Sequence, residues 1–360
     1  MRSRKVTILG PEGTNLYILL QFAIFNVISW FTLFSRIEQL EFNSQNILTR
    51  QIIFSIIGFI VFFLTTYISI ENLYNLALPL FVLSTATLFG LLFTTPILGV
   101  RRWYDLGFVG VPIFIQPSEF AKIIIILFLS KQISLNFNKL TTLVILLVNL
   151  ILIFLQPDLG TTLMIFTAVL LMFFLTEIKI KQSILSFLIV VGIFFVFLEF
   201  DFIGDYQLNR ITQFFTSEDF SQQQSRLSVS SGGLYGDYFN NISENDVFVP
   251  VQTTDFIFSL FSKSFGFFGV ITLFSFWILF FYRVLRIINI VETEFEKYLL
   301  SGLCILLAIQ ILINLLTVLG FIPLTGIAFP LLSLGGSSLF STAIIFGLIN
   351  RVFIENNKVI

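Results

Sequence analysis

The sequence contains no histidine and a single cysteine, Cys304, among 360 residues. The first absence excludes histidine general bases and HExxH zinc sites, and the second excludes CxxC clusters and intrachain disulfides. Only 11% of the residues are charged, and the net charge of −1 gives no electrostatic case for a nucleic-acid partner. We find neither a P-loop nor a GxGxxG motif, which argues against a nucleotide-driven pump. Any chemistry must use carboxylates, lysines, arginines, hydroxyls or a cofactor.

Hydrophobic residues are abundant: they make up 56% of the chain, and its mean hydropathy is +0.97. At roughly 20 residues per span, this composition suits about ten membrane crossings. We therefore predict an all-α integral membrane protein, a ten-helix transmembrane bundle forming one domain over residues 1–360. We count ten apolar runs. The first ends near Phe34, and the other nine cover about 52–70, 76–94, 118–130, 140–155, 161–176, 183–200, 267–282, 298–319 and 338–354.

The basic residues predict the orientation of the bundle. Most of them fall on the side of the N-terminus, and basic loops stay in the cytoplasm. With an even number of spans, both termini are expected in the cytoplasm. Two segments on the outer side are too long for simple turns, namely 95–117 and about 201–255, the latter between spans 7 and 8. Long loops in a compact protein are more often functional than accidental.

Charged residues at the edges of apolar spans persist when they are paired or functional. Glu119 and Lys122 lie three residues apart in a helix expected to begin near Pro117, so they share one face. A structural ion pair and a functional pair explain them equally well. The segment Arg101–Gly107 has the composition of an ordinary aromatic membrane belt.

Two further acids stand at the starts of apolar runs on the outer side. Asp158 lies between Pro157 and Gly160, where capping of the next helix is the simpler interpretation. Asp255 opens the segment after the long loop; an acid in apolar surroundings there has the raised pKa of a general base, and the alternative is again a helix cap.

Arginines and small residues gather on the same predicted side. Arg50, Arg210 and Arg226 suit a phosphate or pyrophosphate, because the guanidinium fork matches those oxygens, although each alone is also an ordinary surface residue. The stretch Gly335–Ser338 before the last span indicates either a close helix approach or a polar lining.

Six ordered motifs together resemble the signature blocks of the RodA/FtsW/SpoVE family, also called SEDS proteins. These motifs are Arg102–Gly107, Gln116–Glu119 with Ala121 and Lys122, Gln156–Gly160, Ser231–Gly236, Thr254–Phe258 and Pro330–Ser337. The resemblance covers roughly Arg50 to Arg351. Gln156–Gly160 and the segment Asp205–Gln207 with Arg210 are more similar to the elongation branch, represented by RodA, than to the division branch, represented by FtsW.

The resemblance implies a peptidoglycan glycosyltransferase that polymerises lipid II at the outer face of the bacterial cytoplasmic membrane. Its implied partners are a class B penicillin-binding protein and the cell-wall elongation machinery. No cofactor is implied, and a divalent cation stays open. The implied catalytic residues are Asp255, Glu119 and Lys122. Asp255 matches the family's essential aspartate and is the implied base, and Glu119 and Lys122 match a pair in the central cavity that would orient that acid or steady the leaving group. The implied substrate-binding residues are Arg50, Arg102, Trp103, Asp158, Arg210 and Ser337.

The chain departs from the family pattern at several positions, and other functions stay open. Thr253, Lys263 and Ser264 stand where a histidine and acids are usual, Val251 where a glutamate is, Ser230 where a glycine is and Leu334 where a tyrosine is. A lipid II flippase is the main alternative, because carriers also use charges beside broken helices. The expected lack of polar groups in the inner half of the spans favours an enzyme. A non-catalytic scaffold ranks third.

Overall fold

The computed structural model describes residues 15–35, 44–97, 99–107, 114–176, 220–238 and 249–356. The predicted span at 183–200 and Arg210 lie outside these residues. The described helices and strands are α1 (Leu16–Phe34), α2 (Ser44–Tyr67), α3 (Ile70–Leu91), β1 (Tyr104–Asp105), β2 (Phe114–Ile115), α4 (Pro117–Ser134), α5 (Lys139–Phe154), α6 (Leu159–Phe174), α9 (Phe220–Ser231), α10 (Ile257–Ile288), α11 (Glu294–Val318) and α12 (Gly336–Asn356).

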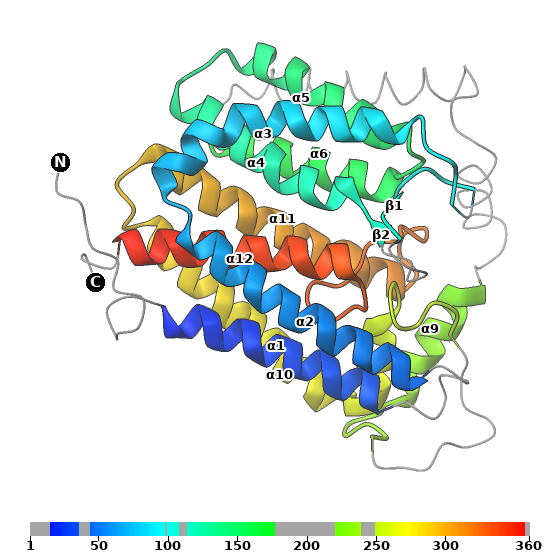
Figure 1. Cartoon of the computed structure of the whole chain (residues 1–360). Helices are drawn as coiled ribbons and strands as arrows, with labels where there is room; N and C mark the ends of the chain where they lie inside the picture. Colours follow the sequence, from blue (N-terminus) through cyan, green and yellow to red (C-terminus); the bar gives the residue numbers. More distant parts are fainter. Residues whose placement is uncertain are drawn as a thin grey trace.

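The long helices lie side by side in one bundle (Figure 1). Six of those described are long and apolar enough to cross a membrane, and two shorter apolar helices, 140–154 and 159–174, accompany them. This confirms the predicted all-α membrane fold. The strands β1 and β2 and the helix α9 lie at one end of the bundle, here called the β end, whereas α1 begins and α12 ends at the opposite end (Figure 1).

Polar side chains start several helices, because the first backbone N–H groups of a helix have no partner within it. Asn15 accepts from the N–H of Tyr17, and Ser69 accepts from that of Asn72. The cap at Ser69 makes α3 begin at Ile70, earlier than the predicted 76. Pro117 is the first residue of α4, as predicted from its preset backbone angle.

The start of α10 differs from the prediction. An apolar run was expected only from 267, but the helix begins at Ile257 and continues across a break at Gly266, whose φ is 62°. The segment 233–238 pairs with the backbone groups that this break frees. Asp237 and Tyr238 donate to the carbonyls of 263 and 264 over 3.1 and 3.0 Å. In a membrane protein, such pairing is what makes a broken helix tolerable.

The helix α9 was missed by the sequence analysis, which expected only a long loop there. Its side chains at every third position are buried and bind the backbone of other helices. Gln222 donates to the carbonyl of Thr317 over 3.1 Å, and Ser225 donates to that of Val318 over 3.0 Å. Ser228 donates to the carbonyl of Ser259 over 3.3 Å. The last carbonyls of α11, which lack helical partners, are satisfied in this way.

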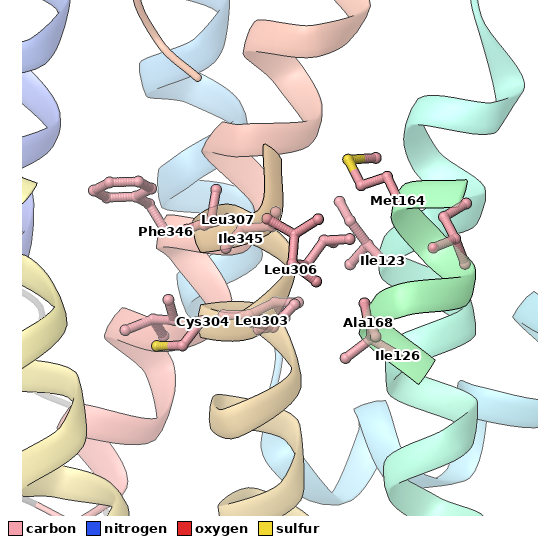
Figure 2. Packing of buried hydrophobic residues seen from close by; sticks show 14 of the residues in the cluster. Ile123, Ile126, Met164, Ala168, Leu303, Cys304, Leu306, Leu307, Ile345 and Phe346 are labelled. Atoms are coloured by element: carbon pink, nitrogen blue, oxygen red, sulfur yellow. The ribbon is translucent and has the colours of Figure 1, made fainter. Parts of the chain in front are cut away.

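An apolar layer fills the middle of the bundle between α4, α6, α11 and α12 (Figure 2). Leu306 of α11 lies towards Ile123 of α4 in this view, and both are buried. The helices approach closely: a Cβ at Gly302 would lie 2.6 Å from Ile126 Cγ2. The labelled side chains of the layer are Ile123, Ile126, Met164, Ala168, Leu303, Cys304, Leu306, Leu307, Ile345 and Phe346.

Polar groups also lie beyond this layer, at the opposite end of the bundle. Arg351 donates to Glu355 over 2.8 Å, and Asn356 donates to Glu296 over 3.2 Å. Glu296 and Arg351 are both buried. The expectation that the inner half of the spans is almost free of polar groups is therefore wrong. The groups are tolerated because they pair with one another at the helix ends.

Candidate functional site

Glu119 and Lys122 form a buried ion pair near the start of α4. The Lys122 ammonium, which is 0% exposed, donates to Glu119 Oε2 over 2.6 Å and to Gln310 Oε1 over 3.0 Å. Ser341 donates to the same Glu119 oxygen over 2.8 Å. The predicted meeting of the two residues on one helix face is confirmed. The pair also joins α4 to α11 and α12, which compensates part of the cost of burying two charges.

Two amides of α11 extend the network towards the β end. Gln310 donates to the carbonyl of Ala328 over 2.9 Å. One helical turn later, Asn314 donates to the carbonyl of Ile327 over 2.8 Å and to that of Asp255 over 2.9 Å. The segment 325–328, which connects α11 to α12, is thus tied to α11 and to the turn before α10.

Asp255 lies in that turn and does not act as the N-cap. The N-cap of α10 is Phe256, so the alternative interpretation of Asp255 as a cap is wrong. The turn is held by the loop before α12: Ser333 donates to the carbonyl of Thr254 over 2.6 Å, and the N–H of Leu334 donates to that of Thr253 over 2.8 Å. Two segments far apart in the sequence are therefore joined by the Ser333 hydroxyl and by a backbone hydrogen bond.

Asp158 caps α6 and also binds α4. Its Oδ1 accepts from the N–H of Thr161 over 3.3 Å, which confirms the predicted cap. Its Oδ2 accepts from Gln116 Nε2 over 3.3 Å. Arg102 lies beside it, with Nη1 at 3.9 Å from Asp158 Oδ1, and donates through Nε to the carbonyl of Gln156 over 3.3 Å. Its Nη2 donates to the carbonyl of Pro157, so the guanidinium is held by one carboxylate and two carbonyls of one turn.

The Asp255 carboxylate and the Arg102 guanidinium both lie close to Gly326. A Cβ at this glycine would lie 3.8 Å from Asp255 Oδ2 and 3.9 Å from Arg102 Nη1. The backbone φ of Gly326 is +72°, a conformation that favours glycine. A carboxylate and a guanidinium, of opposite charge, thus border one point at the β end. Such an arrangement can accept a proton from a hydroxyl and offset negative charge beside it.

The other predicted substrate-binding residues lie at different distances from this point. Ser337, at the start of α12, accepts from the N–H of Gln116 over 3.0 Å and so joins the Asp158 network. Trp103 is half-buried; in the sequence it follows Arg102 and directly precedes β1. The Arg50 guanidinium lies 6.0 Å from the centroid of the Phe54 ring. Arg210 lies outside the described residues.

Four residues of the network were missed by the sequence analysis: Gln310, Asn314, Gly326 and Ser341. The two amides carried a usable signal, because polar residues four positions apart in an apolar span lie on one helix face. Neither Gly326 nor Ser341 stands in a sequence pattern that indicates its role. Within the residues that the structure describes, no group of three or more acidic, cysteine or histidine side chains is arranged to hold a metal ion.

The chain is similar in sequence to known proteins. The chain is 30% identical over 267 residues to the "Peptidoglycan glycosyltransferase MrdB" of Escherichia coli K12, covering 71% of each chain. It is 30% identical over 312 residues to the "Probable peptidoglycan glycosyltransferase FtsW" of Geobacter sp. strain M18, covering 81% of this chain and 82% of that one.

Solved structures share the fold. A chain from a peptidoglycan synthase complex matches with a TM-score of 0.76 and 25% identity, covering 95% of this chain and 98% of that one. The rod shape determining protein RodA of Thermus thermophilus matches with a TM-score of 0.71 and 26% identity, covering 95% and 97%. The profile of the FtsW/RodA/SpoVE family, described as "Cell cycle protein", matches residues 14–358. The chain therefore belongs to the FtsW/RodA/SpoVE family.

Proposed function

We propose that this protein is a peptidoglycan glycosyltransferase that polymerises lipid II into glycan strands at the outer face of the cytoplasmic membrane. The observation that carries the proposal is that the Asp255 carboxylate and the Arg102 guanidinium border the same point beside Gly326, at 3.8 and 3.9 Å from it. A base beside a cation is what glycosyl transfer to a hydroxyl requires when the leaving group is an anion. Relatives named peptidoglycan glycosyltransferases support it.

Asp255 acts as the general base in this proposal. Its carboxylate takes the proton of the acceptor sugar hydroxyl while the hydroxyl oxygen forms a bond to the anomeric carbon of the donor. The bond between that carbon and the pyrophosphate oxygen breaks, and polyprenyl pyrophosphate leaves with the electron pair. The proton on Asp255 then passes to solvent, which restores the carboxylate for the next addition.

The cations offset the charge of the pyrophosphate. Arg102 is the best placed, since its Nη1 borders the same point as Asp255. Arg50 and Arg210 are proposed to bind the more distant phosphate oxygens, and Trp103 to shape the cavity. Asp158 and Ser337 hold the surrounding turns through Gln116. The ion pair of Glu119 and Lys122 helps to orient these turns, because it joins α4 to α11 and α12. The proposal needs no resident cofactor.

The apolar layer favours an enzyme over a carrier. A flippase needs polar groups that a headgroup can reach from both sides of the membrane. Here the buried polar groups at the opposite end pair with one another, and the layer around Leu306 separates them from the network of Lys122 and Gln310. The described residues of α4, α6, α11 and α12 therefore support a reaction at one face of the membrane better than they support passage of a lipid headgroup through the bundle.

The topology and the partner follow from the same proposal. The β end faces outward, both termini lie in the cytoplasm, and a class B penicillin-binding protein crosslinks the strands as they form. A structural match to a peptidoglycan synthase complex that coordinates polymerisation and crosslinking supports the partner. We assign the protein to the elongation machinery that maintains cell shape, on the segments similar to RodA; a division role is the alternative within the family.

The test is polymerisation of labelled lipid II by the purified protein in detergent, with and without a class B penicillin-binding protein. We expect glycan ladders from the wild type and none from Asp255→Ala. The same proteins in proteoliposomes should leave lipid II in its original leaflet. Lipid II transfer without ladders would replace the proposal by a flippase, and silence in both assays would leave a scaffold.

A further inference from the structure

We infer that Asn314 is a positioning residue for the proposed transfer: its side-chain amide fixes the backbone of the base Asp255 and of the segment that carries Gly326. This inference rests on the proposed function. Asn314 is 0% exposed and lies on α11, which packs against α4, α6 and α10 (Figure 1). A side chain on a packed helix is a rigid support for a loop that holds reacting groups.

The contacts of Asn314 join the two segments that border the reacting point. Its Nδ2 donates to the carbonyl of Asp255 over 2.9 Å and to that of Ile327 over 2.8 Å. Ile327 directly follows Gly326, beside which the Asp255 carboxylate and the Arg102 guanidinium lie. A single amide therefore links the turn that carries the base to the segment that carries Gly326.

The chemistry of the amide explains why asparagine suits this position. Both accepting groups are backbone carbonyls, which need donors when they are buried. A primary amide supplies two N–H groups from one nitrogen, and both are used here. An apolar residue of the same size would supply neither, and it would release both carbonyls to move towards other donors.

The expected effect is on the chemical step rather than on substrate binding. Asn314 binds Asp255 through the backbone, so its loss changes where the carboxylate stands and leaves the carboxylate itself intact. A displacement of about 1 Å in a reacting group costs up to about 10²-fold in rate. The arginines proposed to bind the pyrophosphate are held by other contacts, such as that of Arg102 with Gln156.

The experiment compares Asn314→Leu with a matched control, Asn350→Leu, in lipid II polymerisation at a series of lipid II concentrations. Asn350 is also a buried amide, 1% exposed, but it lies on α12 and donates to Thr66 over 3.3 Å, away from the site. We expect Asn314→Leu to lower kcat about 10²-fold with KM changed less than about threefold. We expect Asn350→Leu to keep both constants within about threefold of the wild type.

A second variant, Asn314→Ser, keeps the test decisive if the leucine variant does not fold. Its hydroxyl supplies one donor instead of two, so we expect a smaller loss of kcat at unchanged KM. Wild-type kcat in either Asn314 variant, or an equal loss in the Asn350 control, would overturn the inference while leaving the glycosyltransferase in place. Absence of glycan strands from the wild type would overturn the proposed function, and the inference with it.

Discussion

Asp255 and Arg102, which stand 153 positions apart in the sequence, border one point beside Gly326: Oδ2 of the acid lies 3.8 Å from it, and Nη1 of the arginine lies 3.9 Å from it. The point is where a Cβ would stand if residue 326 were not glycine. The relationship makes the size of residue 326 part of the proposed chemistry.

Gly326→Ala should therefore lower the rate of polymerisation. Its methyl group would stand 3.8 Å from the Asp255 carboxylate and 3.9 Å from the Arg102 guanidinium, and we expect a loss of about tenfold or more from displaced substrate. The positive φ adds strain of about 1–2 kcal/mol to the free energy of folding. The control is Gly99→Ala, which has a φ of +81° with nothing within 4 Å of the added carbon. Equal activity of the two variants, measured as labelled glycan formed, would contradict the need for a glycine at position 326.

The ion pair of Glu119 and Lys122 should contribute strongly to stability only as a pair. Glu119→Gln leaves the fully buried Lys122 ammonium without its carboxylate, and we expect the free energy of unfolding to fall by about 3–5 kcal/mol. Adding Lys122→Met should restore part of it. The control is Glu294→Gln, from an ion pair at 4.0 Å whose side chains are 47% and 58% exposed, with an expected cost of about 0–1 kcal/mol.

Thermal unfolding of these variants in detergent measures the coupling. The account requires the double variant to be more stable than Glu119→Gln alone. If Glu119→Gln melted like Glu294→Gln, the pair would not be a buried structural unit, and its place in the framework of the site would have to be given up.

Gly160→Ala should disturb the site from α6. A Cβ at this position would lie 2.6 Å from the backbone oxygen of Thr325, which cannot turn away as a side chain does. The clash should push apart the cap at Asp158 and the segment that carries Gly326, at a cost of about 1–3 kcal/mol and with a reduced rate. Gly335→Ala is the control for stability, because its nearest neighbour would be at 3.8 Å. Melting temperatures that match between the two variants would show that the contact has room.

Local patterns predicted the parts of the site that lie within one helix. The spacing of Glu119 and Lys122 placed them on one face, and the proline and glycine around Asp158 indicated a cap; both are found. Such features depend on helix geometry alone, so they can be derived from a few neighbouring residues.

Contacts between distant segments could not be predicted in the same way. The point beside Gly326 needs the segment before β1, the turn before α10 and the segment before α12 together, and no local spacing relates them. The helix α9 was missed because its buried face, with Gln222 and Ser225, is polar and binds backbone rather than apolar side chains. The break at Gly266 hid the first two turns of α10 from a search for apolar runs.

The central claim is that the Asp255 carboxylate takes the proton of the acceptor hydroxyl. The most direct measurement is the rate of lipid II polymerisation by Asp255→Asn, which keeps the shape of the side chain and removes its basicity, beside Glu294→Gln, which removes an exposed acid from the opposite end. We predict that Asp255→Asn loses at least about 10²-fold in kcat while remaining folded in the membrane, and that Glu294→Gln matches the wild type. A rate for Asp255→Asn equal to that of Glu294→Gln would contradict the account.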